Sequence, residues 1–100
     1  MSGTVIRRVV IRGRVQGVGY RAWTEDTALL NGIDGWARNR ADGSVEAVFA
    51  GSAEAVAQMI AACRQGPPSA RVERIDEHDS TPEELAMRRR GEGFSTLPTV

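Results

Sequence analysis

The first part of the chain alternates apolar and polar residues in the way that is typical of a half-buried strand. Between Val5 and Val15, one face carries apolar residues and a glycine: Val9, Ile11, Gly13 and Val15. The other face is mostly basic: Arg8, Val10, Arg12 and Arg14. Because successive side chains of a strand point to opposite sides, the pattern predicts a sheet with one face against a core.

Two later segments have the period of a helix. Residues 21–31 are predicted to form a first helix, which ends at Gly32 because glycine readily takes the left-handed conformation there. Ser52 is a suitable N-cap for a second helix. The second helix carries an apolar stripe at positions i, i+3, i+4 and i+7: Val56, Met59, Ile60 and Cys63. Each helix therefore has a face that must pack against another element.

Three more strands complete the main pattern. Residues 33–39 and 45–50 are predicted strands, joined by the turn residues 41–44. Residues 66–68, Gly-Pro-Pro, end the second helix, and residues 70–76 start a fourth strand. The order is β-α-β-β-α-β. Packing both helices on one face of an antiparallel sheet gives an α+β fold, the ferredoxin-like sandwich.

The last quarter of the chain predicts two short elements. Residues 81–84, Thr-Pro-Glu-Glu, have the form of a capping box with proline at the first helical position, so we expect a short surface helix. Residues 88–90 are three arginines that would complement the negative end of that helix. Residues 94–97 could add a last edge strand, which Pro98 ends.

Composition limits the possible partners. The length of 100 residues and the apolar fraction of 41% are typical of one globular domain, which we expect to span residues 1–100 and to be monomeric. The 13 basic residues balance the 13 acidic ones, so no overall field attracts nucleic acid or an anionic membrane. Any anion must be recognised locally. All the basic side chains are arginines, which excludes lysine Schiff-base chemistry.

Residue types for metal binding and disulfides are scarce. Cys63 and His78 each occur once, so a disulfide framework, a zinc site and a Ser-His-Asp type triad are hard to assemble. We therefore expect neither a metal nor a cofactor. The N-terminal apolar run contains two arginines and is too short for a signal sequence or a membrane span. The expected location is the cytoplasm.

A glycine-rich turn, residues 13–21, joins the predicted first strand to the first helix. Such a turn points several backbone N–H groups at one place, in front of the positive end of the helix dipole. Arg21 adds a guanidinium group that a purely structural turn does not require. Together these groups would form an anion site about the size of one phosphate.

The same turn allows other interpretations. Residues 17–22 fit the dinucleotide-binding pattern G-x-G-x-x-A, but that motif needs a parallel crossover repeated across a larger sheet. A P-loop is excluded because no Gly-Lys-Ser/Thr follows. The remaining alternative is a tight turn whose glycines serve the backbone alone.

Two segments resemble the signatures of the acylphosphatase family. The first resemblance lies in Gly13-x-Val15-Gln16-Gly17-Val18-x-Tyr20-Arg21-x-x-Thr24. The second lies in Gly35-Trp36-Ala37-Arg38-Asn39-x-x-Asp42-Gly43-x-Val45-Glu46. Further matches are Gly66-Pro67-x-x-Ala70-x-Val72 and Gly93-Phe94, so the resemblance runs from about Val5 to Leu97. The family's fold is the same ferredoxin-like sandwich.

The resemblance implies an enzyme, a hydrolase that cleaves small-molecule acyl phosphates into a carboxylate and orthophosphate without a metal. It also implies that Arg21 holds the phosphoryl group and that Asn39 positions the attacking water. Thr24 would support the loop or the surroundings of Asn39. The resemblance assigns phosphate binding to the loop residues, through their amides, and to Arg21: Val15, Gln16, Gly17, Val18, Gly19, Tyr20 and Arg21.

Tyr20 and Asn31 both depart from the family pattern. Tyr20 stands where phenylalanine is commoner, which would add a hydroxyl near the anion site. Asn31 stands where an apolar core residue is expected, and Leu29 or Leu30 would take its place.

Two other function classes are possible for this fold. A ferredoxin-like sheet can also bind RNA through aromatic residues on its open face, and a phosphate-sensing domain would keep the anion site without catalysis.

Overall fold

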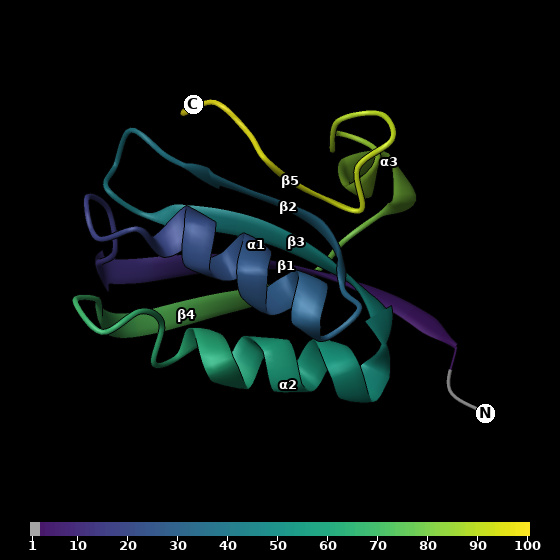
Figure 1. Cartoon of the computed structure of the whole chain (residues 1–100), viewed down its shortest axis with the longest axis horizontal. Helices are drawn as coiled ribbons and strands as arrows, with labels where there is room; N and C mark the ends of the chain where they lie inside the picture. The colour runs from purple at the N-terminus through teal and green to yellow at the C-terminus, as the bar shows by residue number, and fades with distance from the viewer. Residues whose placement is uncertain (1–2) are drawn as a thin grey trace.

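The computed structural model describes residues 3–100 and, over that range, shows a five-stranded sheet with two long helices on one face (Figure 1). The strands are β1 (Thr4–Arg14), β2 (Asp34–Asn39), β3 (Val45–Ser52), β4 (Arg71–Asp79) and β5 (Phe94–Thr96). The helices are α1 (Tyr20–Leu30), α2 (Ala53–Cys63) and α3 (Pro82–Leu85). The predicted β-α-β-β-α-β order and the ferredoxin-like fold are confirmed. Within residues 3–100, no helix is long and apolar enough to cross a membrane.

The sheet is mixed rather than wholly antiparallel, which corrects the prediction. Its strand order is β4-β1-β3-β2-β5, and β5 runs parallel to β2 with Gly35 opposite Phe94. The direction of β5 follows from its connection. β4 ends opposite the early part of β1, with Asp79 facing Arg7, and β5 begins beside the start of β2. The connection therefore stays at one end of the sheet, and β5 must run in the same direction as β2.

The core lies between the sheet and the two long helices. Every residue of the predicted apolar stripe of α2 is buried: Val56, Met59, Ile60 and Cys63. The alternating residues of the strands face this stripe: Val9, Ile11, Val45, Ala47 and Phe49. Ser52 caps α2 as predicted, since its hydroxyl oxygen accepts a hydrogen bond of 3.1 Å from the backbone N–H of Ala55. This packing holds α1 and the ends of the strands in place relative to one another.

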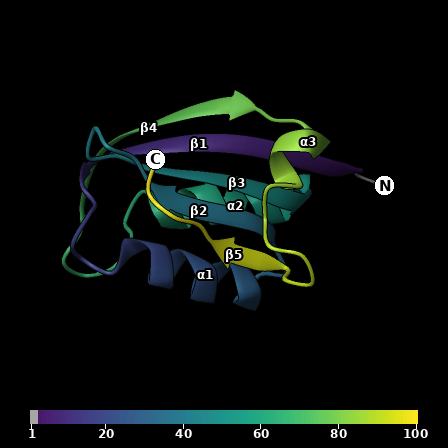
Figure 2. The ribbon, with the colours of Figure 1, turned by 90° about the horizontal axis from the view of Figure 1, so that it is seen from above.

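The opposite face of the sheet carries α3 (Figure 2) and several ion pairs. Trp36 is buried on this face, and its indole N–H donates to the carbonyl of Glu84 at 2.7 Å. Glu46 is also buried and lies between two arginines, with N···O distances of 3.0 Å to Arg8 and 2.7 Å to Arg38. Among the described residues this face exposes no aromatic ring on which an RNA base could stack.

The segment after α3 differs from the prediction. Thr81 does cap α3, because its hydroxyl accepts from the backbone N–H of Glu84 at 3.2 Å. The helix ends at Leu85, so the three arginines lie beyond it and do not complement its dipole. Arg88 instead donates to the carbonyl of Gly93 at 3.2 Å, and Arg89 donates to backbone and side-chain oxygens of β5. These arginines fasten the edge strand to the rest of the fold.

The end of α1 also differs. Leu29 and Leu30 are 61% and 86% exposed, so neither replaces Asn31 as a core residue. Gly32 has φ 65°, in the left-handed region, and turns the chain back toward the core. The backbone N–H of Ile33 then donates to the carbonyl of Ala28 at 2.8 Å, and the Ile33 side chain is buried. The apolar residue that closes this end of the core therefore comes from beyond the helix.

Candidate active site

The glycine-rich loop between β1 and α1 takes a conformation that its glycines make possible. Gly17 and Gly19 have φ values of 75° and 77°, which cost other residues about 1–2 kcal/mol each. Gly19 is the residue before α1, and its carbonyl accepts the N–H of Trp23 at 3.0 Å. The loop therefore leads directly into the N-terminus of α1, where backbone N–H groups have no partner within the helix.

Gln16 connects this loop to the turn between β2 and β3. Its side-chain NH₂ group donates to the carbonyls of Arg40 at 2.7 Å and Ser44 at 2.8 Å. Asn39 is the last residue of β2, directly before that turn. The side chain of Gln16 thus fixes the distance between the glycine-rich loop and Asn39.

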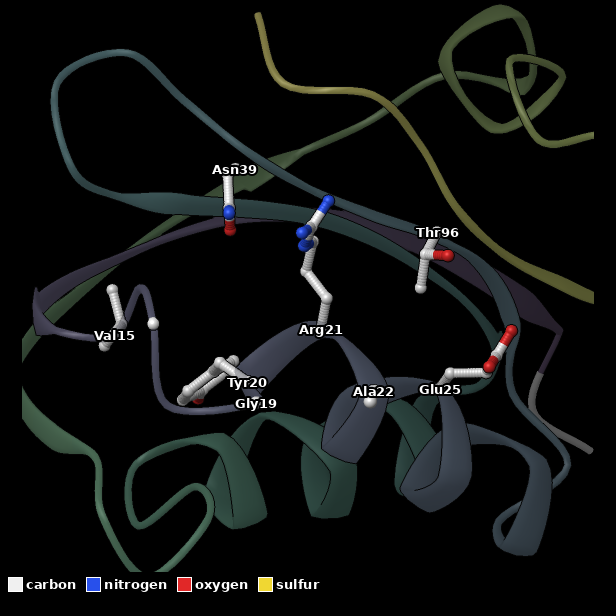
Figure 3. Close-up of a pocket in the computed structure, with 9 residues that line it drawn as sticks. Val15, Gly19, Tyr20, Arg21, Ala22, Glu25, Asn39 and Thr96 are labelled. Carbon is white, nitrogen blue, oxygen red and sulfur yellow. The ribbon is translucent and has the colours of Figure 1, made fainter.

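A pocket of about 360 Å³ lies where the loop, α1, β2 and β5 meet (Figure 3). Its walls include residues predicted from sequence: Val15, Gly17, Gly19, Tyr20, Arg21 and Asn39. Ala22, Glu25 and Thr96 also line the pocket. Gln16 and Val18 belong to the loop but do not line it, and Thr24 is fully buried in α1. The two family signatures therefore meet at one pocket in the folded chain.

Arg21 is half-buried and lines this pocket together with Asn39, and both side chains point into it (Figure 3). One of its N–H groups donates to the carbonyl of Leu97 at 3.4 Å. Within residues 3–100, no carboxylate lies within ion-pair distance of Arg21. Its charge is therefore not neutralised by an acid of the described chain, and its N–H groups can bind an anion.

Asn39 is held through its backbone and leaves its side chain available. It pairs with Val45 of β3, and its carbonyl accepts the N–H of Val100 at 3.1 Å. The side chain points into the pocket (Figure 3). It makes no hydrogen bond to another residue in the described part of the chain. The amide can therefore both donate to and accept from a bound molecule.

The hydroxyl groups of Tyr20 and Thr24 point away from the pocket and bond within the protein. The Tyr20 hydroxyl donates to the carbonyl of Cys63 at 2.5 Å inside the core, and burial raises the pKa of this phenol. The expectation of a hydroxyl near the anion site is therefore wrong. The Thr24 hydroxyl donates to the carbonyl of Tyr20 at 2.8 Å, so it braces the first turn of α1 and makes no bond to Asn39. Burial also raises the pKa of the Cys63 thiol, to about 12.

The sequence analysis did not predict three of the pocket residues: Ala22, Glu25 and Thr96. Glu25 could have been found, because residues four apart lie on one face of a helix and Arg21 precedes it by four. Thr96 had no such signal, since it reaches the pocket only because β5 pairs with β2, with Thr96 opposite Ala37. Within residues 3–100, no cluster of three or more His, Cys, Asp or Glu side chains is placed to hold a metal ion.

The turn that follows Asn39 depends on an ionised aspartate. The Asp42 carboxylate accepts from the N–H and hydroxyl of Ser44 at 2.9 Å and 2.5 Å. These bonds, with Arg40 and Arg12 nearby, lower the pKa of Asp42 to about 2. The pKa of Asp42 in the folded chain lies below its unfolded value of about 4. The ionised carboxylate therefore stabilises the folded chain above about pH 4, and this stabilisation is lost as the pH falls toward 2. We expect Asp42→Asn to weaken this acid dependence.

Urea unfolding at pH 4.5 and pH 2.5 measures this effect. The original chain should lose more stability between the two pH values than the Asp42→Asn variant. Asp26→Asn is a suitable control, because Asp26 is exposed on α1 and makes no ion pair in residues 3–100. Equal losses for the original chain and for Asp42→Asn would contradict the prediction.

Residues 7–95 of this chain match the family model for acylphosphatase, a range that contains both the glycine-rich loop and Asn39. The chain belongs to the acylphosphatase family. An acylphosphatase from Rhodopseudomonas palustris strain BisB18 is 59% identical over 97 residues, which are 97% of this chain and 98% of that protein. One from Bradyrhizobium diazoefficiens is 59% identical over 95 residues, 95% of this chain and 96% of that one.

A solved acylphosphatase also shares the fold. The crystal structure of acylphosphatase from Bacillus subtilis matches with a TM-score of 0.80 and 31% sequence identity. The match covers 93% of this chain and 98% of the Bacillus chain. The acylphosphatase relationship therefore extends over the sheet, both long helices and the segments that form the pocket.

Proposed function

We propose that this chain hydrolyses acyl phosphates, the mixed anhydrides of a carboxylic and a phosphoric acid, at the pocket between the glycine-rich loop and the end of β2. One observation carries the proposal. The Arg21 guanidinium and the Asn39 side-chain amide both line the same pocket. Neither group makes a hydrogen bond or an ion pair to another side chain in residues 3–100. Membership of the acylphosphatase family and the two acylphosphatases at 59% identity support it.

The loop and Arg21 would hold the phosphoryl group. Phosphoryl transfer passes through a loose transition state with charge spread over the equatorial oxygens, so catalysis relies on position and charge. Arg21 stays protonated and offers two parallel N–H groups to two of those oxygens. Loop N–H groups would bind the remaining oxygen, and one donor of this kind contributes about 3–4 kcal/mol in the transition state. We extend the proposal to a metal-independent reaction, because these groups supply the positive charge.

Asn39 would position the water. Its side-chain carbonyl oxygen accepts a hydrogen bond from one O–H group of the water while its NH₂ group donates one to the phosphoryl group. The water oxygen attacks phosphorus, and the bond from phosphorus to the acyl oxygen breaks. The leaving group is a carboxylate, a weak base that needs no general acid. The second water proton passes to a phosphoryl oxygen, so the products are the carboxylate and orthophosphate.

The setting of the reaction is part of the same proposal. We propose a monomeric single domain that acts in the cytoplasm. The apolar stripe of α2 is already buried in the core, which supports a monomer. The buried free thiol of Cys63 fits a reducing compartment.

Steady-state hydrolysis of benzoyl phosphate at neutral pH in EDTA tests the proposal. We expect turnover by the original chain and a loss of about 100-fold to 1,000-fold in kcat for Asn39→Ala, with KM changed little, because Asn39 acts on the water. Asn31→Ala is the matched control, since Asn31 is exposed at the end of α1 and its side-chain amide bonds, within residues 3–100, only to the Thr27 carbonyl. Its kcat should stay within about twofold.

A folded original chain without turnover would contradict the proposal. It would leave a phosphate-binding domain, which is the alternative that keeps the anion site without the reaction. Equal losses in Asn39→Ala and Asn31→Ala would remove the assigned role of Asn39 while leaving the activity itself in place.

A further inference from the structure

The pocket contains a negative charge that binding a phosphoryl group does not require. Glu25 lies on α1 one turn after Arg21, is half-buried and lines the same pocket. In Figure 3 its carboxylate lies on the side of Ala22 and Thr96, away from the loop and from Asn39. The pocket therefore has a phosphoryl end, built from the loop, Arg21 and Asn39, and a second end built from Ala22, Glu25 and Thr96.

Glu25 has no partner that would explain its place. In the described part of the chain no arginine lies within ion-pair distance of Glu25, and no group donates a hydrogen bond to it. Arg21, the cation nearest to it along the helix, donates to the Leu97 carbonyl instead. Several other acids are paired, as Asp76 is with Arg12 at 3.0 Å, and Asp26, which has no ion pair among the described residues, is exposed and does not line the pocket. Glu25 thus presents an uncompensated carboxylate to whatever fills the second end of the pocket.

We infer that Glu25 selects the substrate by the charge of its acyl group. The inference rests on the proposed function. With the phosphoryl group at the loop, the space left in the pocket lies toward Glu25, so an acyl group that enters it meets a carboxylate. Acyl groups that carry a second anion, such as a carboxylate, are repelled. Neutral acyl groups are accepted, and cationic ones are favoured. A repulsive group of this kind gives specificity without a tight pocket.

The size of the effect follows from Coulomb's law. Two unit charges about 7 Å apart in a partly solvated pocket change the rate about fivefold to tenfold. The effect must also weaken in salt, because the Debye length falls to about 3 Å at 1 M. If a substitution at Glu25 only disturbed the packing, it would not change the selectivity for charge in a salt-dependent way.

Three benzoyl phosphates that differ in the charge of the para substituent test the inference: benzoyl phosphate, 4-carboxybenzoyl phosphate and 4-trimethylammoniobenzoyl phosphate. For each chain, kcat/KM is expressed relative to benzoyl phosphate. In Glu25→Gln we expect the ratio for the carboxylate substrate to rise about fivefold and the ratio for the ammonium substrate to fall by a similar factor. Both changes should shrink in 0.5 M NaCl.

Asp26→Asn is the matched control. It removes the same charge from the neighbouring residue, which is exposed and does not line the pocket. Its ratios should equal those of the original chain. Unchanged ratios in Glu25→Gln, or equal changes in both variants, would overturn the inference.

A binding measurement separates this inference from the proposed function. Benzoylphosphonate and 4-carboxybenzoylphosphonate cannot be hydrolysed, and their Kd ratio reports the same selectivity. If the original chain turns over no acyl phosphate, the proposed function fails, and the Kd ratio in Glu25→Gln still supports or overturns the role of Glu25. If turnover occurs and neither ratio moves, the role of Glu25 alone fails.

Discussion

With Arg21 replaced by alanine, kcat/KM for benzoyl phosphate is expected to fall about 1,000-fold or more, a loss of about 4 kcal/mol of transition-state stabilisation. The guanidinium is the positive side chain among the residues that line the pocket, which Asn39 also lines (Figure 3). Within residues 3–100, the guanidinium makes one long hydrogen bond, of 3.4 Å, to the Leu97 carbonyl. The fold therefore depends little on it, and the unfolding temperature should change by less than about 3 °C.

Two further variants sharpen this test. Arg21→Lys keeps the charge but loses the two parallel N–H groups, so its activity should lie between those of the original chain and Arg21→Ala. Arg90→Ala removes an exposed arginine beyond α3 and should leave kcat/KM within about twofold. Activity of Arg21→Ala within tenfold of the original chain would mean that the phosphoryl group is held without the guanidinium.

Gly35→Ala is expected to cost about 4 kcal/mol of folding free energy, a large part of the 5–15 kcal/mol typical of a domain. Gly35 is buried in β2 with φ 147°, where side chains are rarely found. A Cβ atom there would lie 1.8 Å from the carbonyl oxygen of Val48 and 2.8 Å from its carbon. These are backbone atoms of the neighbouring strand, so β3 or β2 would have to shift.

Urea unfolding followed by tryptophan fluorescence, to which Trp36, the next residue, and Trp23 contribute, measures this loss. Gly32→Ala serves as the control, because Gly32 also has a positive φ of 65° but an added Cβ would meet nothing within 4 Å. It should lose only about 1–2 kcal/mol, the cost of the left-handed backbone. Equal losses at the two positions would show that the contact with Val48 relaxes without cost.

Local patterns predicted the elements that face the core. The alternation in β1 and the stripe on α2 each reflect the fixed period of one element, and burial follows the period wherever one face must be covered. The residues Val9, Ile11, Met59 and Ile60 are buried for this reason. The glycine-rich turn could also be predicted from sequence, since the left-handed backbone at Gly17 and Gly19 favours glycine at these positions.

Contacts between distant segments were not readable in this way. The position of Thr96 depends on the pairing of β5 with β2, and β5 is only three residues long. The burial of Trp36 depends on α3. The Trp36 indole N–H donates to the carbonyl of Glu84 in that helix, 48 residues later in the sequence. The hydroxyl of Tyr20 turned away from the pocket because the carbonyl of Cys63 offers it a partner inside the core.

The sequence alone thus determined the order of the main elements, the core faces of the strands and α2, and the loop with Arg21 at its end. These features follow from residue type and spacing within one segment. The tertiary structure decided the parallel edge strand, the covered second face and the meeting of Arg21, Glu25, Asn39 and Thr96 in one pocket. Such features depend on which segments pair across the fold, and no short stretch of sequence carries that information.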